Sequence, residues 1–148
     1  MTIATTIAAL QVVHLTITGV SSAPTSMPSN LDQVKKPTVL VIPSAATWNP
    51  ATAGLSGLRR QSREYEVRCY VQPVAQGITG IDAGYDACVT LLDAFGNKYL
   101  ADISLGNTVD NIRAISDSGV RGGQGGPQWA QVDWWGFIYR VTVSEKSA

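Results

Sequence analysis

The chain contains 148 residues, 45% of them hydrophobic, and its 11 Lys and Arg balance 11 Asp and Glu. This length suits one hydrophobic core, which predicts a single domain over residues 1–148. A formal net charge of zero excludes a global field that would draw the protein to nucleic acid or to an anionic membrane.

The start of the chain gives no targeting signal. The first 31 residues carry no formal charge, and no apolar run approaches the roughly 18 residues of a membrane span. We therefore expect a protein made in the cytoplasm that has no membrane partner. Cys69 and Cys88 each lie among apolar residues, and because disulfides are uncommon in the cytoplasm, both are predicted to be reduced thiols of the core.

A first helix is predicted because Ile3, Ile7, Leu10 and His14 fall at helical spacing. A threonine at its start can cap the first turn, and Gly19 is the latest end that the pattern allows. Residues 13–18 also alternate between apolar and polar, which fits a strand and leaves the helix end open. Residues 20–37 are rich in Ser and Pro and are predicted to be an irregular surface connection.

A buried strand is predicted over residues 39–42, where Val-Leu-Val-Ile runs without interruption up to Pro43. Such a run is typical of a strand covered on both faces, and we expect it in the centre of the sheet. Residues 44–61 follow as a long loop. Loops longer than about 12 to 15 residues are uncommon in compact domains and are usually functional or disordered.

Residues 62–72 alternate between an apolar and a charged side, which predicts a half-exposed strand that ends at Pro73. An apolar stripe at helical spacing then predicts a helix from residue 81, capped by Thr79 and closed by Gly96. The stripe comprises Ile81, Tyr85, Cys88, Leu92 and Phe95.

Two further strands are predicted, over residues 109–115 and 129–143, on either side of the glycine-rich residues 118–128. One face of the last strand holds Trp135, Phe137, Tyr139, Val141 and Val143. Its other face holds a second apolar patch, made of Ala130, Val132, Trp134 and Ile138.

This order of elements predicts an α+β fold, with a mainly antiparallel sheet of about four strands, two helices packed on one face, and long loops. The second apolar patch of the last strand then needs cover from the long loop or from another subunit. An exposed patch of that kind usually marks an interface.

No catalytic, cofactor or metal site is predicted, so the protein is not expected to be an enzyme. His14 is the only histidine, whereas nucleophiles need a positioned base and zinc sites need several ligands. We expect His14 to be a hydrogen-bonded structural residue. Asp82, Asp86 and Asp93 have no converging ligand in the sequence and are expected on a solvated helix face.

Two patterns could indicate phosphate or nucleic-acid binding. The glycines of residues 122–126 precede a strand and lack the Lys-Ser or Lys-Thr of a phosphate loop, so a flexible hairpin is preferred. A basic cluster near Trp48 could grip phosphates and stack on bases. It comprises Arg59, Arg60, Arg63 and Arg68. Because Glu64 and Glu66 dilute it, ion pairing between subunits is the preferred interpretation.

Five segments of the chain follow one another in an informative order. They are the helix opening at residues 1–10, the strand 37–43 with Trp48 after it, Tyr-Glu-Val-Arg at 65–68, Leu-Gly-Asn-Thr-Val at 105–109, and the closing strand 135–143. This order resembles the tail terminator, or tail completion, proteins of long-tailed bacteriophages. The likeness spans nearly the whole chain and consists of element order and hydrophobicity.

The resemblance implies a virion structural protein without catalytic residues, assembled in the host cytoplasm. Such a protein forms a ring, hexameric in this family, that caps the tail tube protein and joins it to a neck or head-completion protein. DNA would pass through the lumen without specific binding. The alternatives are a neck, connector or tail tube subunit and, from another class, a nucleic-acid-binding module or small enzyme.

Subunit or partner contacts are predicted in the long loop, at the tip of the glycine-rich segment and on the second patch of the last strand. The residues are Trp48, Leu55, Leu58, Arg59 and Arg60, then Val120 and Arg121, then Val132, Trp134 and Ile138. A closed ring needs a head-to-tail contact between two different surfaces.

Overall fold

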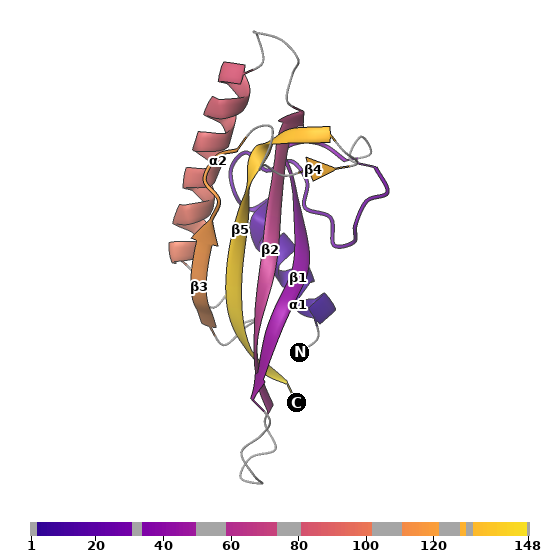
Figure 1. Cartoon of the computed structure of the whole chain (residues 1–148), viewed down its shortest axis with the longest axis vertical. Coiled ribbons are helices and arrows are strands. Elements are labelled where there is room, and N and C mark those ends of the chain that lie inside the picture. Colours follow the sequence, from indigo (N-terminus) through magenta and orange to yellow (C-terminus); the bar gives the residue numbers. More distant parts are fainter. Residues whose placement is uncertain are drawn as a thin grey trace.

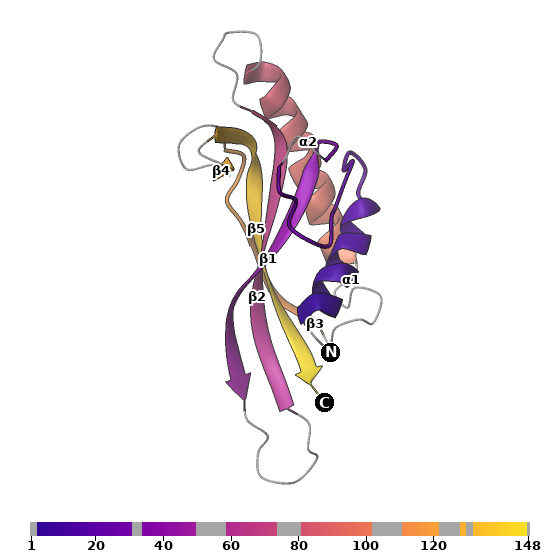
Figure 2. The same ribbon diagram turned by 90° about the vertical axis from the view of Figure 1, so that its right-hand side faces the viewer.

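Two helices cover one face of an antiparallel sheet, which confirms the predicted α+β class (Figures 1 and 2). The computed structural model describes residues 3–30, 34–49, 59–73, 81–101, 111–121, 128–129 and 132–147. The helices are α1 (Ile3–Leu15) and α2 (Ile81–Ala101). The strands are β1 (Thr38–Asn49), β2 (Arg59–Pro73), β3 (Asn111–Asp117), β4 (Gln128–Trp129) and β5 (Val132–Ser147).

The strand order in the sheet is β1-β2-β5-β3, and β4 pairs with the start of β5. Strands β2 and β5 are the two central strands and pair antiparallel along nearly their whole length, from Arg59↔Ser147 to Pro73↔Trp134. Among the described residues, β1 therefore forms one edge of the sheet and β3 forms the other.

The expected central position of residues 39–42 is wrong, because β1 is an edge strand. Val39 and Val41 face the helices, while Leu40 packs on the other face with Tyr70 and Trp134. The apolar run thus indicates that other side chains cover both faces of the strand. It does not indicate whether another strand pairs with each of its two edges.

Within the loop predicted over residues 44–61, residues 44–49 and 59–61 are strand, and residues 50–58 lie outside the described part of the chain. β1 passes Pro43 through an irregularity in its register before Ala46 and continues to Asn49, and β2 already begins at Arg59. Proline lacks an amide hydrogen, but at an edge strand or bulge it is tolerated. Figure 2 shows these ends of β1 and β2 running past both helices. We call residues 44–49 and 59–64 the arm.

Helix α1 ends at Leu15, so the alternation in residues 13–18 does not form a strand. A turn follows, with hydrogen bonds from Thr16 N to Val13 O (3.0 Å) and from Ile17 N to His14 O (3.1 Å). Gly19 then adopts a φ of 101°, a conformation that glycine reaches without strain. The connection that follows is irregular, as predicted.

Helix α2 passes through Gly96 and ends at Ala101, five residues beyond the predicted stop. Its buried apolar side chains are Cys88, Leu91, Phe95 and Tyr99, whereas Tyr85 of the predicted stripe is 51% exposed and Leu92 is half-buried. The buried stripe therefore lies slightly to one side of the predicted one. Tyr99 extends it by a further turn, which keeps the helix on the sheet past the glycine.

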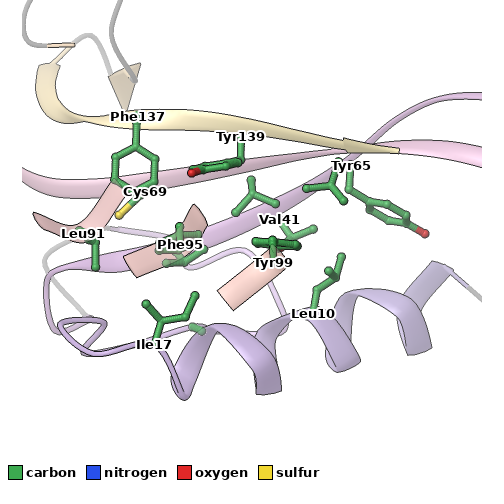
Figure 3. Close-up of a cluster of buried hydrophobic side chains, with 14 of the residues drawn as sticks. Leu10, Ile17, Val41, Tyr65, Cys69, Leu91, Phe95, Tyr99, Phe137 and Tyr139 are labelled. Atoms are coloured by element: carbon green, nitrogen blue, oxygen red, sulfur yellow. The ribbon is translucent and has the colours of Figure 1, made fainter. Parts of the chain in front are cut away.

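The core lies between the helices and the near face of the sheet (Figure 3). Phe95 of α2 packs against Phe137 and Tyr139 of β5, with ring centroids 5.3 and 5.6 Å apart. Cys69 and Cys88 are both buried and free, as predicted. Burial raises the pKa of the Cys88 thiol to about 11.

Candidate interaction surfaces

His14 lies at the centre of a buried hydrogen-bond network that joins both helices to the sheet. Its Nδ1 is 2.9 Å from Gln11 Oε1, and its Nε2 is 2.5 Å from the Tyr99 hydroxyl. Gln11 Nε2 donates to the carbonyls of Pro24 (2.7 Å) and Val39 (2.9 Å). Gln11 Oε1 must therefore accept from Nδ1–H, and Tyr99 donates to Nε2.

This network confirms His14 as a satisfied structural residue. Its exposed fraction is 0%, and burial lowers its pKa from 6.5 to about 3. A neutral imidazole with both ring nitrogens occupied is not available to a substrate as a base. Among the described residues, no group of three or more His, Cys, Asp or Glu side chains could hold a metal ion.

The predicted contacts at the long loop fall on the arm. Trp48 is the register partner of Gln61, and Asn49 is the register partner of Arg60, so Trp48, Arg59 and Arg60 lie where β1 and β2 leave the body. Their side chains lie outside the described part of the chain. Leu55 and Leu58 lie wholly outside the described residues.

Of the two contact residues predicted at the tip, only one is exposed. Val120 is half-buried and packs against the core, whereas Arg121 is exposed. Arg121 pairs through its backbone with Gly136, with N···O distances of 2.9 and 3.0 Å, and its Nε donates to Ser118 O at 3.1 Å. These bonds fix residues 118–121 beside β5, so Arg121 alone presents a side chain to a partner.

The expectation of an exposed patch around Trp134 is wrong. Trp134 is only 5% exposed, because it packs with Leu40 and Tyr70 and its ring lies 5.8 Å from Lys36 Nζ. The connection before β1 thus supplies the cover that the sequence analysis expected from the long loop or from another subunit. Ile138 is half-buried, and the Val132 side chain lies outside the described part of the chain.

Charged residues of β2 and β5 on this sheet face form ion pairs with one another. Arg68 Nη2 lies 2.9 Å from Glu66 Oε2, and Arg140 lies 3.8 Å from Glu64 and 3.9 Å from Glu66. The pairs are partly exposed, so they contribute little stability. Since both arginines already face carboxylates, this face is poorly suited to bind phosphates.

Exposed apolar side chains gather instead on the outer sides of the helices, which the sequence analysis missed. On the helices these are Leu100 (79%), Val12 (65%), Leu15 (52%), Tyr85 (51%) and Val89 (42%), and the exposed Met27 and Ile115 lie elsewhere. In α2 these residues form a second stripe at helical spacing, adjacent to the buried one. A count of apolar residues around the whole helix, beyond the single best stripe, would have found it.

A groove of about 370 Å³ lies between this second stripe and the β3 edge of the sheet. Its apolar lining comes from Val89, Leu92 and Leu100, and Asp93 and Asp117 add two carboxylates. Tyr139 also lines it and donates its hydroxyl to Leu92 O at 3.2 Å. Burial, together with the charges of Asp117 and Asp93, raises the pKa of Tyr139 to about 12.

A second hollow, of about 340 Å³, lies on the other side of α2 against the turn after α1, and its one carboxylate is Asp86. Neither described helix is long and apolar enough to cross a membrane. No protein-family model matches the chain, and no curated protein matches it significantly.

Proposed function

We propose that this chain is a structural subunit that assembles into a closed ring, and that the ring is the tail terminator of a bacteriophage tail. One observation carries the assembly: beyond the bridge with Ser22 that covers the start of β1, no described strand pairs with the outer edge of β1 or with that of β3. An unpaired edge strand offers a row of free backbone groups to another chain. Two different edges on one subunit suit the head-to-tail contacts of a ring.

The exposed side chains of α2 support the same proposal. Val89 and Leu100 lie beside the β3 edge, so apolar surface and free backbone groups occur together there. Burying such side chains against a neighbour is favourable by about 25 cal/mol per Å². Identification as a tail terminator rests on the resemblance in element order.

The experiment is to measure the mass of the purified protein in solution and then to add it to growing tail tubes. We expect one closed ring of fixed mass that binds tube ends and stops elongation, visible by electron microscopy. Indefinite cylinders formed by the chain alone would indicate a tail tube subunit. A monomer at every concentration that also leaves tubes uncapped would contradict the proposal.

A nucleic-acid-binding module is the competing class, and a salt titration of DNA binding separates the two. Binding driven by phosphate contacts weakens steeply as salt concentration rises. We expect no such binding to short duplex DNA, because Arg68 and Arg140 already face Glu64 and Glu66.

A further inference from the structure

The outer edge of β1 is partly covered by the connection between α1 and β1, which comprises residues 16–37, with residues 31–33 outside the described part. Ser22 forms a bridge with Thr38, and its carbonyl accepts a hydrogen bond from Val39 N at 3.0 Å. Figure 1 shows part of the connection beside β1, on the side of the sheet away from α2 and β3. A neighbour that approaches this side of the subunit therefore meets the connection.

The connection carries an exposed apolar side chain and an exposed cation. Met27 is 51% exposed. Lys35 is also exposed, and its carbonyl accepts from Ser22 Oγ at 2.6 Å, which holds its backbone next to the start of β1. The other charged residues of the connection are Asp32, which lies outside the described part, and the half-buried Lys36, so its net charge is +1.

The opposite side of the sheet contains the groove between α2 and β3, which offers apolar walls and carboxylates. Val89 and Leu100 line it and are exposed. Asp93 and Asp117 also line it and are exposed, and neither forms an ion pair with any described residue. Asp117 Oδ1 accepts a hydrogen bond from Gly119 N at 2.8 Å, so its carboxylate is held at the rim.

The two carboxylates make the groove a region of negative potential. Besides burial, the charges of Asp117 and Asp93 raise the pKa of Tyr139 in the groove floor. The cations of α2 and β3 are Lys98, which lines a different hollow, and Arg113, whose side chain lies outside the described part of the chain. The groove therefore suits an apolar group accompanied by a cation.

Among the described residues, the exposed cations are Lys35, Arg121 and Arg140. Arg140 already faces Glu64 and Glu66. Arg121 follows β3 closely in the chain and lies beside β5, on the same side of the subunit as the groove. Lys35, which takes part in none of the described ion pairs, is the exposed cation at the β1 side.

We propose that the connection of one copy, through Met27 and Lys35, docks in the groove between α2 and β3 of a second copy, where Lys35 faces Asp93 and Asp117. The inference rests on the proposed ring and names its contact. Apolar surface then meets apolar surface, and the cation meets the carboxylates. Because the two surfaces lie at opposite edges of the sheet, each copy can bind one neighbour through its connection and another through its groove, as a head-to-tail ring requires.

Charge reversal tests the contact. Lys35→Glu on the connection, or Asp93→Lys in the groove, should raise the dissociation constant of the assembly by about tenfold or more, because like charges then meet. The variant with both changes restores an opposite pair and should recover most of the lost affinity. The matched control is Asp86→Lys, which changes an exposed carboxylate of α2 at the other hollow and should leave the constant unchanged.

Zero-length cross-linking of the original chain locates the contact directly. A carbodiimide joins a lysine amine to a carboxylate when the two groups touch, so we expect Lys35 to become linked to Asp93 or Asp117. Mass spectrometry identifies the linked peptides. In rings assembled from a mixture of isotope-labelled and unlabelled copies, part of this product should contain one labelled and one unlabelled peptide, which shows that the link joins two copies.

Sedimentation at several concentrations gives the dissociation constants, and thermal melting shows that each variant folds. Single reversals that leave the ring intact, a double variant as weak as the singles, or rings without the mixed Lys35 product would overturn this contact while upholding the proposed ring. A monomeric wild type would overturn both. If Asp93→Lys rings remain intact but no longer cap tubes, the groove receives the tube protein, and the contact between copies is wrong.

Discussion

At the scale of single residues, His14 shows how the core fixes a polar group. Gln11, Tyr99 and two backbone carbonyls provide a hydrogen-bond partner for each side-chain nitrogen of this network. Because buried polar groups are costly when unpaired, the network specifies how α1 sits relative to β1 and α2. The helical stripe of the sequence indicated that His14 is structural. Its partner Tyr99 is 85 residues away, and Val39, which accepts from Gln11, is 28 residues from Gln11, so these contacts could not be inferred.

The stability of the protein should fall in mild acid because of His14. Its pKa is 6.5 in the unfolded chain and about 3 in the folded one, so between these values only the unfolded chain binds the proton. The contribution of a neutral His14 is complete above about pH 6.5 and is lost as pH falls, by roughly 1 kcal/mol per pH unit.

Chemical denaturation at several pH values measures this effect. The control is His14→Gln, which removes the titrating ring while keeping a polar side chain. Its free energy of unfolding should be lower throughout and should depend less on pH between about pH 6 and pH 4. Equal pH slopes in the two proteins would show that His14 is not buried in a neutral form.

At the scale of elements, α2 and the turn after α1 each contain a glycine, and the two differ in whether alanine could replace them. Gly96 has a helical backbone, and a Cβ there would lie 3.7 Å from the Tyr139 hydroxyl, which is ordinary contact. Gly19 has a φ of 101°, and a Cβ there would lie 3.2 Å from Leu91 Cδ1. The sequence treats both as helix stops, but only the second requires glycine.

Gly96→Ala should therefore stabilise the protein by up to about 1 kcal/mol, the difference in helix propensity. Gly19→Ala should destabilise it by about 1 kcal/mol or more, because alanine disfavours a positive φ. Denaturant unfolding of both variants tests the pair. A destabilised Gly96→Ala would mean that the helix does not continue through this position.

At the scale of the whole molecule, substitutions of two large apolar residues distinguish an effect on folding stability from an effect on assembly. Leu100 is 79% exposed, whereas Trp134 is 5% exposed. Leu100→Glu should leave the monomer as stable as before, because its side chain loses almost no burial, but should lower the mass of the assembly if α2 meets a neighbour.

Trp134→Glu should instead unfold the chain, at a cost of at least about 3 kcal/mol for a lost aromatic side chain and a buried charge. Melting curves and sedimentation of the two variants provide the comparison. A soluble, folded Trp134→Glu protein with a smaller assembly mass would instead show that Trp134 lies exposed at an interface, as the sequence predicted.

Local patterns in the sequence were sufficient to predict the main helices and strands and the fold class. Period-two alternation identified the near faces of β2 and β5, and helical spacing identified α1 and α2, because both patterns depend on neighbours a few residues apart. It also indicated reduced core cysteines and a structural His14. These features follow from which side of each element is apolar, which any single segment records.

Which element covers which could be seen only in the folded chain. It placed β1 at an edge, extended β1 and β2 into the predicted loop, buried Trp134 beneath the segment before β1, and exposed the second stripe of α2. Each of these outcomes depends on contacts between residues far apart in the chain, and an apolar or charged pattern in one segment does not specify its distant partner.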